Sequence, residues 1–297
     1  MKILSIALLI FLSFPIAYQT GRKSQTTKRP TGRVEYSKFF SQSLKQDVDF
    51  AISLPASYSS EKDRRYPLII FLHGLFNSER DWEERGMQQQ LELLRAKGKI
   101  EEFIIALPYG ENSFYVNGKD GVRYEDAIVN DFTNFVEKNY RTASGRKMIA
   151  GISMGGYGAL MIAFKHPEKF TAVAANSAAL FEEAPKPPSS PNDVRAKYRY
   201  EIASKIFGSP IDQEFFKSNN PLHLAKANAA KLKGLKIYFD VGEQDRYGFE
   251  AGNNKLASIL TEAGIAYEYH KVPGGHGWDF LISRSEPFLN FCWKAVN

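Results

Sequence analysis

The stretch that decides the fold is Gly151-Ile152-Ser153-Met154-Gly155-Gly156, in which a serine is flanked by glycines at the G-x-S-x-G spacing. It follows the apolar residues 148–150 and opens the small-residue, helix-forming stretch 154–164. In a strand–turn–helix context such a serine occupies a tight, strained turn, and the flanking glycines lack the Cβ atoms that would clash across it. The N–H groups at the start of the helix point towards the serine. We therefore predict that Ser153 is a nucleophile.

The segments around this motif predict a mostly parallel sheet. Runs without alternation, typical of strands buried on both faces, occur at 68–72, 103–107, 148–150, 172–175 and 237–239. Apolar and polar residues alternate at 34–40 and 48–54, as in half-buried antiparallel strands, and a last strand is expected at 266–272. Helical patterns lie between them, at 82–97, 127–140, 154–164 and 256–263. This order predicts an α/β fold with a mostly parallel sheet and an antiparallel N-terminal edge.

One stretch, 181–233, interrupts the alternation of strands and helices. It starts with the proline-rich residues 185–191 and continues as short helical segments. Two interpretations remain open: a small helical cap that shapes a pocket, or packing over an edge of the sheet.

A serine hydroxyl needs a base, and position along the chain separates the five histidines. His276 lies in the glycine-rich loop 273–278, after the last strand, where the carboxyl ends of parallel strands bring catalytic loops together. His73 lies before the serine, and His166 lies at the far end of the serine's helix, roughly 18 Å away at about 1.5 Å per residue. His223 lies in the stretch 181–233, and His270 lies inside the last strand. We predict that His276 is the base.

The acid that orients this histidine is expected between the serine and the histidine in the chain. Asp245 lies in the loop just after the strand around 237–239 and is the preferred candidate. Glu243 in the same loop is the main alternative, whereas Asp240 is still inside the strand. The acid would hold the imidazole tautomer and stabilise the imidazolium.

Two backbone N–H groups are expected to bind the oxyanion, those of Met154, directly after the nucleophile, and Leu75, after the strand 68–72. A pocket that favours aromatic groups is expected from residues in loops after strands or beside the histidine loop: Trp82, Tyr109, Tyr115, Asn117 and Trp278. No paired-histidine zinc motif, cysteine cluster or phosphate-binding glycine–lysine loop is present. We therefore expect neither a metal nor a cofactor.

Charge and hydropathy divide the chain into three parts. Residues 1–17 carry Lys2 and an apolar run, typical of a signal peptide, and 18–33 form a polar, basic linker before a domain at 34–297. The net charge is +6, but six cations and no anion precede Glu35, so the domain itself is close to neutral. We therefore predict a secreted or periplasmic enzyme with no nucleic-acid partner and no stable membrane insertion after cleavage.

An ordered set of motifs resembles the esterase D/feruloyl esterase/antigen 85 family over residues 45–295. The set comprises Phe71-Leu72-His73-Gly74, Tyr124-Glu125-Asp126, Asn139-Tyr140-Arg141, Gly151 to Gly156, Val241 to Asp245 and Gly275-His276-Gly277-Trp278. The resemblance implies an α/β-hydrolase fold, a Ser-Asp-His triad at Ser153, Asp245 and His276, and an oxyanion hole at Leu75 and Met154. Members of the family hydrolyse S-formylglutathione, transfer mycolyl groups to trehalose, release feruloyl or acetyl groups from plant polysaccharide, or cleave siderophore esters.

The function expected from the sequence is hydrolysis of carboxylic esters through an acyl-enzyme, on a small-molecule or polysaccharide ester. A signal peptide argues against the cytosolic S-formylglutathione reaction and suits feruloyl or acetyl esters. Two alternatives remain: an acyltransferase of the mycolyltransferase type with the same triad, and a non-catalytic binding module, which a complete serine, acid and histidine set disfavours.

Overall fold

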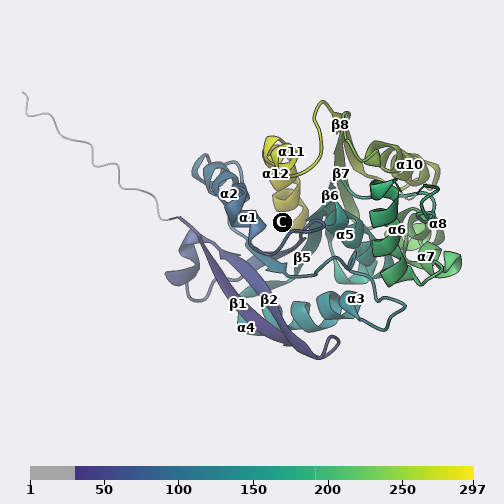
Figure 1. Cartoon of the computed structure of the whole chain (residues 1–297). Helices are drawn as coiled ribbons and strands as arrows, with labels where there is room; N and C mark the ends of the chain where they lie inside the picture. Colours follow the sequence, from purple (N-terminus) through teal and green to yellow (C-terminus); the bar gives the residue numbers. More distant parts are fainter. Residues whose placement is uncertain (1–30, 191) are drawn as a thin grey trace, which may run out of the picture.

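Eight strands form a single sheet in the order β1-β2-β4-β3-β5-β6-β7-β8. Its edge strands, β1 and β8, lie on opposite sides of the molecule (Figure 1). The computed structural model describes residues 31–190 and 192–297, so the predicted signal peptide and most of the predicted linker lie outside the described residues. The strands are β1 (Arg33–Ser41), β2 (Gln46–Leu54), β3 (Tyr66–Leu72), β4 (Ile104–Pro108), β5 (Thr142–Ile152), β6 (Ala172–Asn176), β7 (Lys236–Gly242) and β8 (Glu268–Val272).

The direction of the strands confirms the prediction of a mostly parallel sheet with an antiparallel N-terminal edge. Strand β1 pairs with β2, and β2 with β4, in antiparallel fashion, whereas all pairs from β4 to β8 are parallel. Every residue of β3, β4 and β6 is buried, which explains why these strands have no polar alternation.

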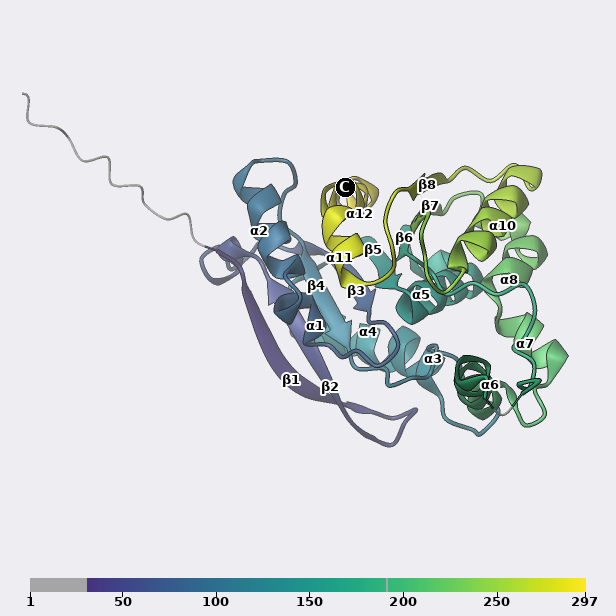
Figure 2. The same ribbon diagram turned by 45° about the horizontal axis from the view of Figure 1, so that its top comes forward.

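Helices cover both faces of the sheet (Figure 2). The α-helices are α1 (Asp81–Glu84), α2 (Met87–Ala96), α3 (Tyr124–Asp126), α4 (Thr133–Asn139), α5 (Met154–Lys165), α6 (Val194–Phe207), α7 (Gln213–Asn219), α8 (Pro221–Ala227), α9 (Ala229–Leu232), α10 (Phe249–Glu262), α11 (Trp278–Ser283) and α12 (Ser285–Val296). Shorter turns are η1 (Ala56–Ser59) and η3 (Pro167–Lys169), which are 3₁₀, and η2 (Ala127–Phe132), which is π-helical. One buried cluster joins the sheet to α1, α2, α11 and α12, and a larger one joins its other face to α4, α5, α8 and α10.

Two predicted helices differ from the structure in detail. The stretch 82–97 is divided into α1 and α2 at Gly86, whose φ of 97° is a left-handed conformation that interrupts a helix. The stretch 256–263 is the second half of a longer helix, α10, which starts after Gly248. In both cases the periodicity was the correct signal for a helix and the glycine set its boundary.

The stretch 181–233 connects β6 to β7 and contains α6, α7, α8 and α9. Side chains of Asp193, Asp212 and Asn220 accept hydrogen bonds from the first N–H groups of α6, α7 and α8, so local sequence starts each of these short helices. Within the described residues, no helix has the length and apolar character needed to cross a membrane.

Candidate active site

Ser153 lies in a strained turn between the end of β5 and the start of α5. Its φ of 56° and ψ of −114° fall outside the regions that non-glycine residues usually adopt. A Cβ atom on Gly151 would lie 2.3 Å from the Gly155 carbonyl oxygen, and one on Gly155 would lie 2.0 Å from that of Leu72. Both positions therefore require glycine for the turn to pack against β3, and the turn holds the Ser153 side chain at the carboxyl edge of the sheet.

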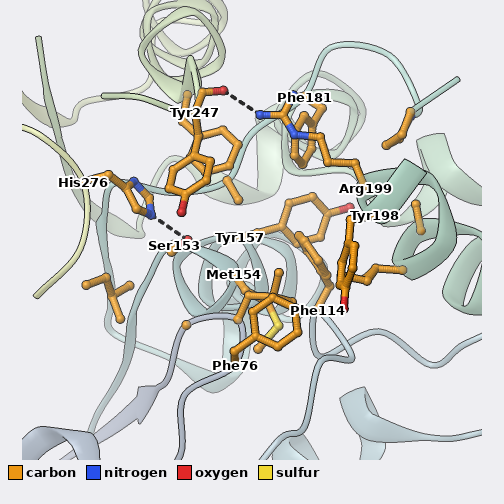
Figure 3. A pocket seen from close by; sticks show the side chains of 18 of the residues that line it. Phe76, Phe114, Ser153, Met154, Tyr157, Phe181, Tyr198, Arg199, Tyr247 and His276 are labelled. Atoms are coloured by element: carbon orange, nitrogen blue, oxygen red, sulfur yellow. Dashed lines mark hydrogen bonds between the residues drawn. The ribbon is translucent and has the colours of Figure 1, made fainter. Parts of the chain in front are cut away.

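A chain of two hydrogen bonds links Ser153 to an acid (Figure 3 shows its serine end). The Ser153 Oγ lies 2.9 Å from Nε2 of His276, whose Nδ1 lies 2.8 Å from Oδ2 of Asp245. The side chains of His276 and Asp245 are 7% and 0% exposed. An Nδ1–H held by the Asp245 carboxylate leaves the Nε2 lone pair free to accept the serine proton, so the arrangement can generate a serine nucleophile.

The loop after β7 positions Asp245, and the two other acids considered do not reach His276. The second oxygen of Asp245 accepts the N–H of Tyr247 at 2.8 Å, which fixes the carboxylate. Glu243 is exposed. Asp240 is fully buried in β7, where it accepts hydrogen bonds from Tyr238 Oη at 2.6 Å and Arg284 Nε at 3.2 Å.

The two predicted oxyanion donors lie beside the serine. Met154 is the first residue of α5, and a Cβ on Gly74, next to Leu75, would lie 3.6 Å from the Ser153 Cβ. In the described part of the chain, the N–H groups of Leu75 and Met154 have no hydrogen-bond acceptor. Both donors are therefore available to a negatively charged oxygen on a carbon bonded to Ser153 Oγ.

His73 holds the loop that carries Leu75. Its Nδ1 donates to the Gly74 carbonyl at 2.8 Å, and its Nε2 accepts the Gly110 N–H at 2.9 Å. Burial lowers the pKa of His73 from 6.5 to about 4, because a charged imidazole loses its hydration in this position. The neutral ring thus joins the ends of β3 and β4 beneath the loop that carries Leu75. We call this loop, residues 74–77, the oxyanion loop.

We expect His73 to make stability depend on pH. Since the folded pKa is below the unfolded value, the unfolded chain takes up a proton first, and stability is lost as the pH falls through 6.5 towards 4. Between pH 7.5 and pH 4, the free energy of unfolding should fall by about 3 kcal/mol more in the wild type than in a His73→Gln variant. Urea unfolding at several pH values measures this difference, and equal pH dependence in both proteins would contradict it.

A cavity of about 420 Å³ opens beside Ser153 and His276. Its walls come from the oxyanion loop, α5, α6, α7 and the loops after β6, β7 and β8. Aromatic side chains dominate the wall, and several are labelled in Figure 3: Phe76, Phe114, Tyr157, Phe181, Tyr198 and Tyr247. Such a wall suits an apolar or aromatic group attached to the reacting carbonyl.

The predicted pocket residues are only partly in this wall. Trp278 lines the cavity, and its Nε1 donates to Asn77 Oδ1 at 3.2 Å. The prediction that Trp82 lines the pocket is wrong. Trp82 is buried in α1 on the other face of the sheet, where its Nε1 donates to Gln88. A position after a strand was not enough to show which way this side chain points.

The pocket predictions for Tyr109, Tyr115 and Asn117 are also wrong, because none of these three side chains lines the cavity. Tyr109 and Tyr115 pack their rings against His73, at 5.5 and 5.8 Å between centroids, and so support the oxyanion loop from behind. Asn117 exchanges two hydrogen bonds of 3.1 Å with Asp126 at the start of the helical stretch. All three stabilise loops after β4.

The sequence interpretation missed the face of α6 that forms much of the wall. Its residues share the spacing of one helical face: Arg195, Tyr198, Arg199, Ile202 and Ala203. That spacing is readable in the sequence, but the same pattern would mark a face packed in the core. Only the tertiary structure shows that this face borders a cavity.

Comparison with known proteins identifies the family and the fold of this chain. The family model described as putative esterase matches residues 41–283. An acetyl esterase of Caldicellulosiruptor saccharolyticus is 28% identical over 254 residues, covering 82% of this chain and 91% of that protein. The solved structure of a ferulic acid esterase is 26% identical, with a TM-score of 0.76, and the match covers 90% of this chain and 99% of that one.

A fluorophosphonate-binding serine hydrolase of Staphylococcus aureus shares the fold, with a TM-score of 0.72 at 20% identity over 90% of this chain and 99% of that one. The fold is therefore that of the α/β-hydrolases, as predicted. Because the family model matches most of this chain, the chain belongs to the putative esterase family and is a carboxylic ester hydrolase.

Proposed function

We propose that the protein hydrolyses esters through an acyl-enzyme formed on Ser153, with His276 as general base and Asp245 as its orienting acid. The observation that carries the proposal is the continuous hydrogen-bonded chain from Ser153 Oγ through His276 to Asp245 at the wall of a cavity. The strained turn at Ser153 adds weight, because such strain persists where function requires it.

In this mechanism His276 Nε2 takes the proton of Ser153 Oγ as that oxygen attacks the ester carbonyl. The resulting oxyanion accepts hydrogen bonds from the N–H groups of Leu75 and Met154, and the imidazolium is stabilised by Asp245. His276 then gives its proton to the leaving alcohol. Water, activated by the neutral imidazole, attacks the acyl-enzyme and releases the acid, which returns Ser153 to its initial state.

The cavity supports a substrate with a small or aromatic acyl group, such as acetyl or feruloyl. Its volume is sufficient for a group of this size, and its aromatic wall favours a ring. The printed names of relatives, acetyl esterase and endo-1,4-beta-xylanase/feruloyl esterase, point in the same direction. A carbohydrate-linked ester is thus the substrate class that we propose.

We also propose that 181–233 acts as a cap and that the protein is exported. Within the cap, α6 contributes one face to the cavity wall, which supports a role in substrate binding rather than simple packing. Export rests on the signal-peptide pattern of residues 1–17. Cleavage would be seen as a mature N-terminus near residue 18 in protein recovered from outside the cytoplasm.

An acyl-enzyme predicts that products partition independently of the leaving group. We expect p-nitrophenyl acetate and phenyl acetate to give the same ratio of acetohydroxamate to acetate when hydroxylamine is present, because both pass through acetyl-Ser153. Product analysis at a fixed hydroxylamine concentration measures the ratio. A ratio that changes with the leaving group would exclude a common intermediate, and no turnover of acetyl or feruloyl esters would exclude the proposed function.

A further inference from the structure

Three arginines line the outer part of the cavity: Arg195 and Arg199 from α6, and Arg246 from the loop that carries Asp245. Arg195 and Arg246 are exposed and Arg199 is half-buried. Further along the same face of α6, Ala203 and Phe207 are buried. The cavity is therefore apolar in its inner part and cationic at its rim, and no Asp or Glu of residues 31–190 and 192–297 lines it.

These guanidinium groups contact main-chain and tyrosine oxygens rather than carboxylates. Arg195 Nη1 lies 3.4 Å from the carbonyl oxygen of Arg246, and Arg199 Nη2 donates to that of Tyr247 at 3.0 Å (Figure 3). Arg246 Nη2 donates to Tyr247 Oη at 3.1 Å. Each guanidinium has five N–H donors, so most of the donors remain for a ligand.

Nearby acids do not neutralise this cluster. The side chains of Glu182, Glu183 and Glu201 pair with lysines, and the Asp193 carboxylate caps α6. None of the three arginines forms an ion pair with a carboxylate within the described residues, and residues 1–30 and 191 contain no Asp or Glu. The three like charges therefore have no carboxylate counter-charge within the described residues, and each can attract an anion at the cavity rim.

The position of the cluster relates it to one part of an ester. The Arg246 guanidinium lies over the Tyr247 ring, 5.0 Å from its centroid, and this ring packs edge-on to the His276 ring with 4.8 Å between centroids. In the proposed mechanism His276 protonates the leaving oxygen, so the substituents of the alcohol extend past His276. The oxyanion donors Leu75 and Met154 belong to other segments, the loop after β3 and the start of α5.

We propose that Arg195, Arg199 and Arg246 form a subsite for a carboxylate on the alcohol part of the ester. The enzyme would then prefer acylated hydroxy acids or acylated sugar acids over neutral esters that release an alcohol of the same size. The planar donors of arginine match the two oxygens of a carboxylate, which a lysine would bind only as a point charge. This inference rests on the proposed function, because it uses His276 to locate the leaving group.

The test compares two substrates that differ in one charge. The pair is 4-acetoxybenzoate and 4-acetoxybenzamide, which share the acetyl group and the phenol ring. We expect the ratio of their kcat/KM values, benzoate over benzamide, to fall roughly tenfold or more in the triple variant Arg195→Gln/Arg199→Gln/Arg246→Gln, because hydrogen bonds between charged groups are lost. Because a general loss of activity would lower both kcat/KM values, the ratio is the diagnostic quantity, and a ratio that stays at the wild-type value counts against the subsite.

A matched control removes three positive charges elsewhere. Lys62, Lys97 and Lys138 are exposed, lie outside the segment 181–233, and do not line the cavity. Their replacement by Gln should leave the ratio at the wild-type value, and an equal fall would show that net charge alone is responsible. Raising the ionic strength from about 0.02 M to about 0.5 M should lower the ratio in the wild type and not in the arginine variant.

A second substrate pair tests which part of the ester carries the anion. The monoester of 4-nitrophenol with glutaric acid and 4-nitrophenyl pentanoate differ by a carboxylate on the acyl part. If the triple arginine variant changes the kcat/KM ratio of this pair and not that of the first, the assignment to the alcohol is overturned. If it changes the ratio of neither pair, the subsite is overturned. Turnover of none of the four esters above the Ser153→Ala level would instead reject the proposed function.

Discussion

Ser153→Ala should lower kcat for ester hydrolysis by roughly 100,000-fold or more, because in the proposed mechanism the acyl-enzyme forms on the Ser153 hydroxyl. The residual rate would come from the oxyanion donors and from substrate binding, which the substitution leaves in place. Alanine removes one atom from a side chain whose backbone is already held between β5 and α5, so the fold should be retained.

The measurement is hydrolysis of p-nitrophenyl acetate and methyl ferulate by the wild type and the variant at equal concentration. Circular dichroism and the midpoint of urea unfolding check that the variant is folded. Activity within a few-fold of the wild type in a folded Ser153→Ala variant would exclude Ser153 as the nucleophile. In that case the hydrogen bond from Ser153 to His276 would have only a structural role.

Asp245→Asn should lower kcat about 10,000-fold at neutral pH. The amide nitrogen of asparagine is a donor, and in place of the carboxylate oxygen that faces His276 Nδ1 it would favour the tautomer with the proton on Nε2. That tautomer cannot accept the proton of Ser153 Oγ. The neutral amide also gives no stabilisation to the imidazolium that forms during attack.

Glu243→Gln is the matched control, because it makes the same change of carboxylate to amide two residues away at an exposed position. We expect its kcat and KM to equal those of the wild type with the same esters. A large loss in Glu243→Gln together with a small one in Asp245→Asn would transfer the role of the acid to Glu243. The two variants together therefore separate the alternatives that the sequence left open.

Much of the fold could be predicted because burial on two faces leaves a direct trace in sequence. Strands β3, β4 and β6 are buried along their whole length, so their residues form apolar runs with no alternation. Boundaries were less predictable. The break between α1 and α2 depends on the left-handed conformation of Gly86, and a glycine within a helical pattern does not show which conformation it adopts.

The positions of the serine, acid and histidine candidates could also be predicted, since each lies next to the carboxyl end of a strand. Parallel strands bring these ends together, so the loops after β5, β7 and β8 had to meet. The hydrogen bonds that join Ser153, His276 and Asp245 follow from that topology. The choice between Asp245 and Glu243 did not follow, because both lie in one loop and only side-chain direction distinguishes them.

The sequence by itself determined the fold class, the strained glycine-flanked turn at Ser153 and the loops that carry the serine, acid and histidine candidates. Only the tertiary structure decided which residues line the pocket. Tyr109 and Tyr115 pack against His73 outside the cavity, and α6 supplies much of the wall. The physical reason is that local patterns record whether a residue is buried, whereas the direction of a side chain depends on contacts with residues distant in the chain. The arginine rim beside Tyr247 is such a contact, since it joins residues of α6 to a loop about 50 residues later.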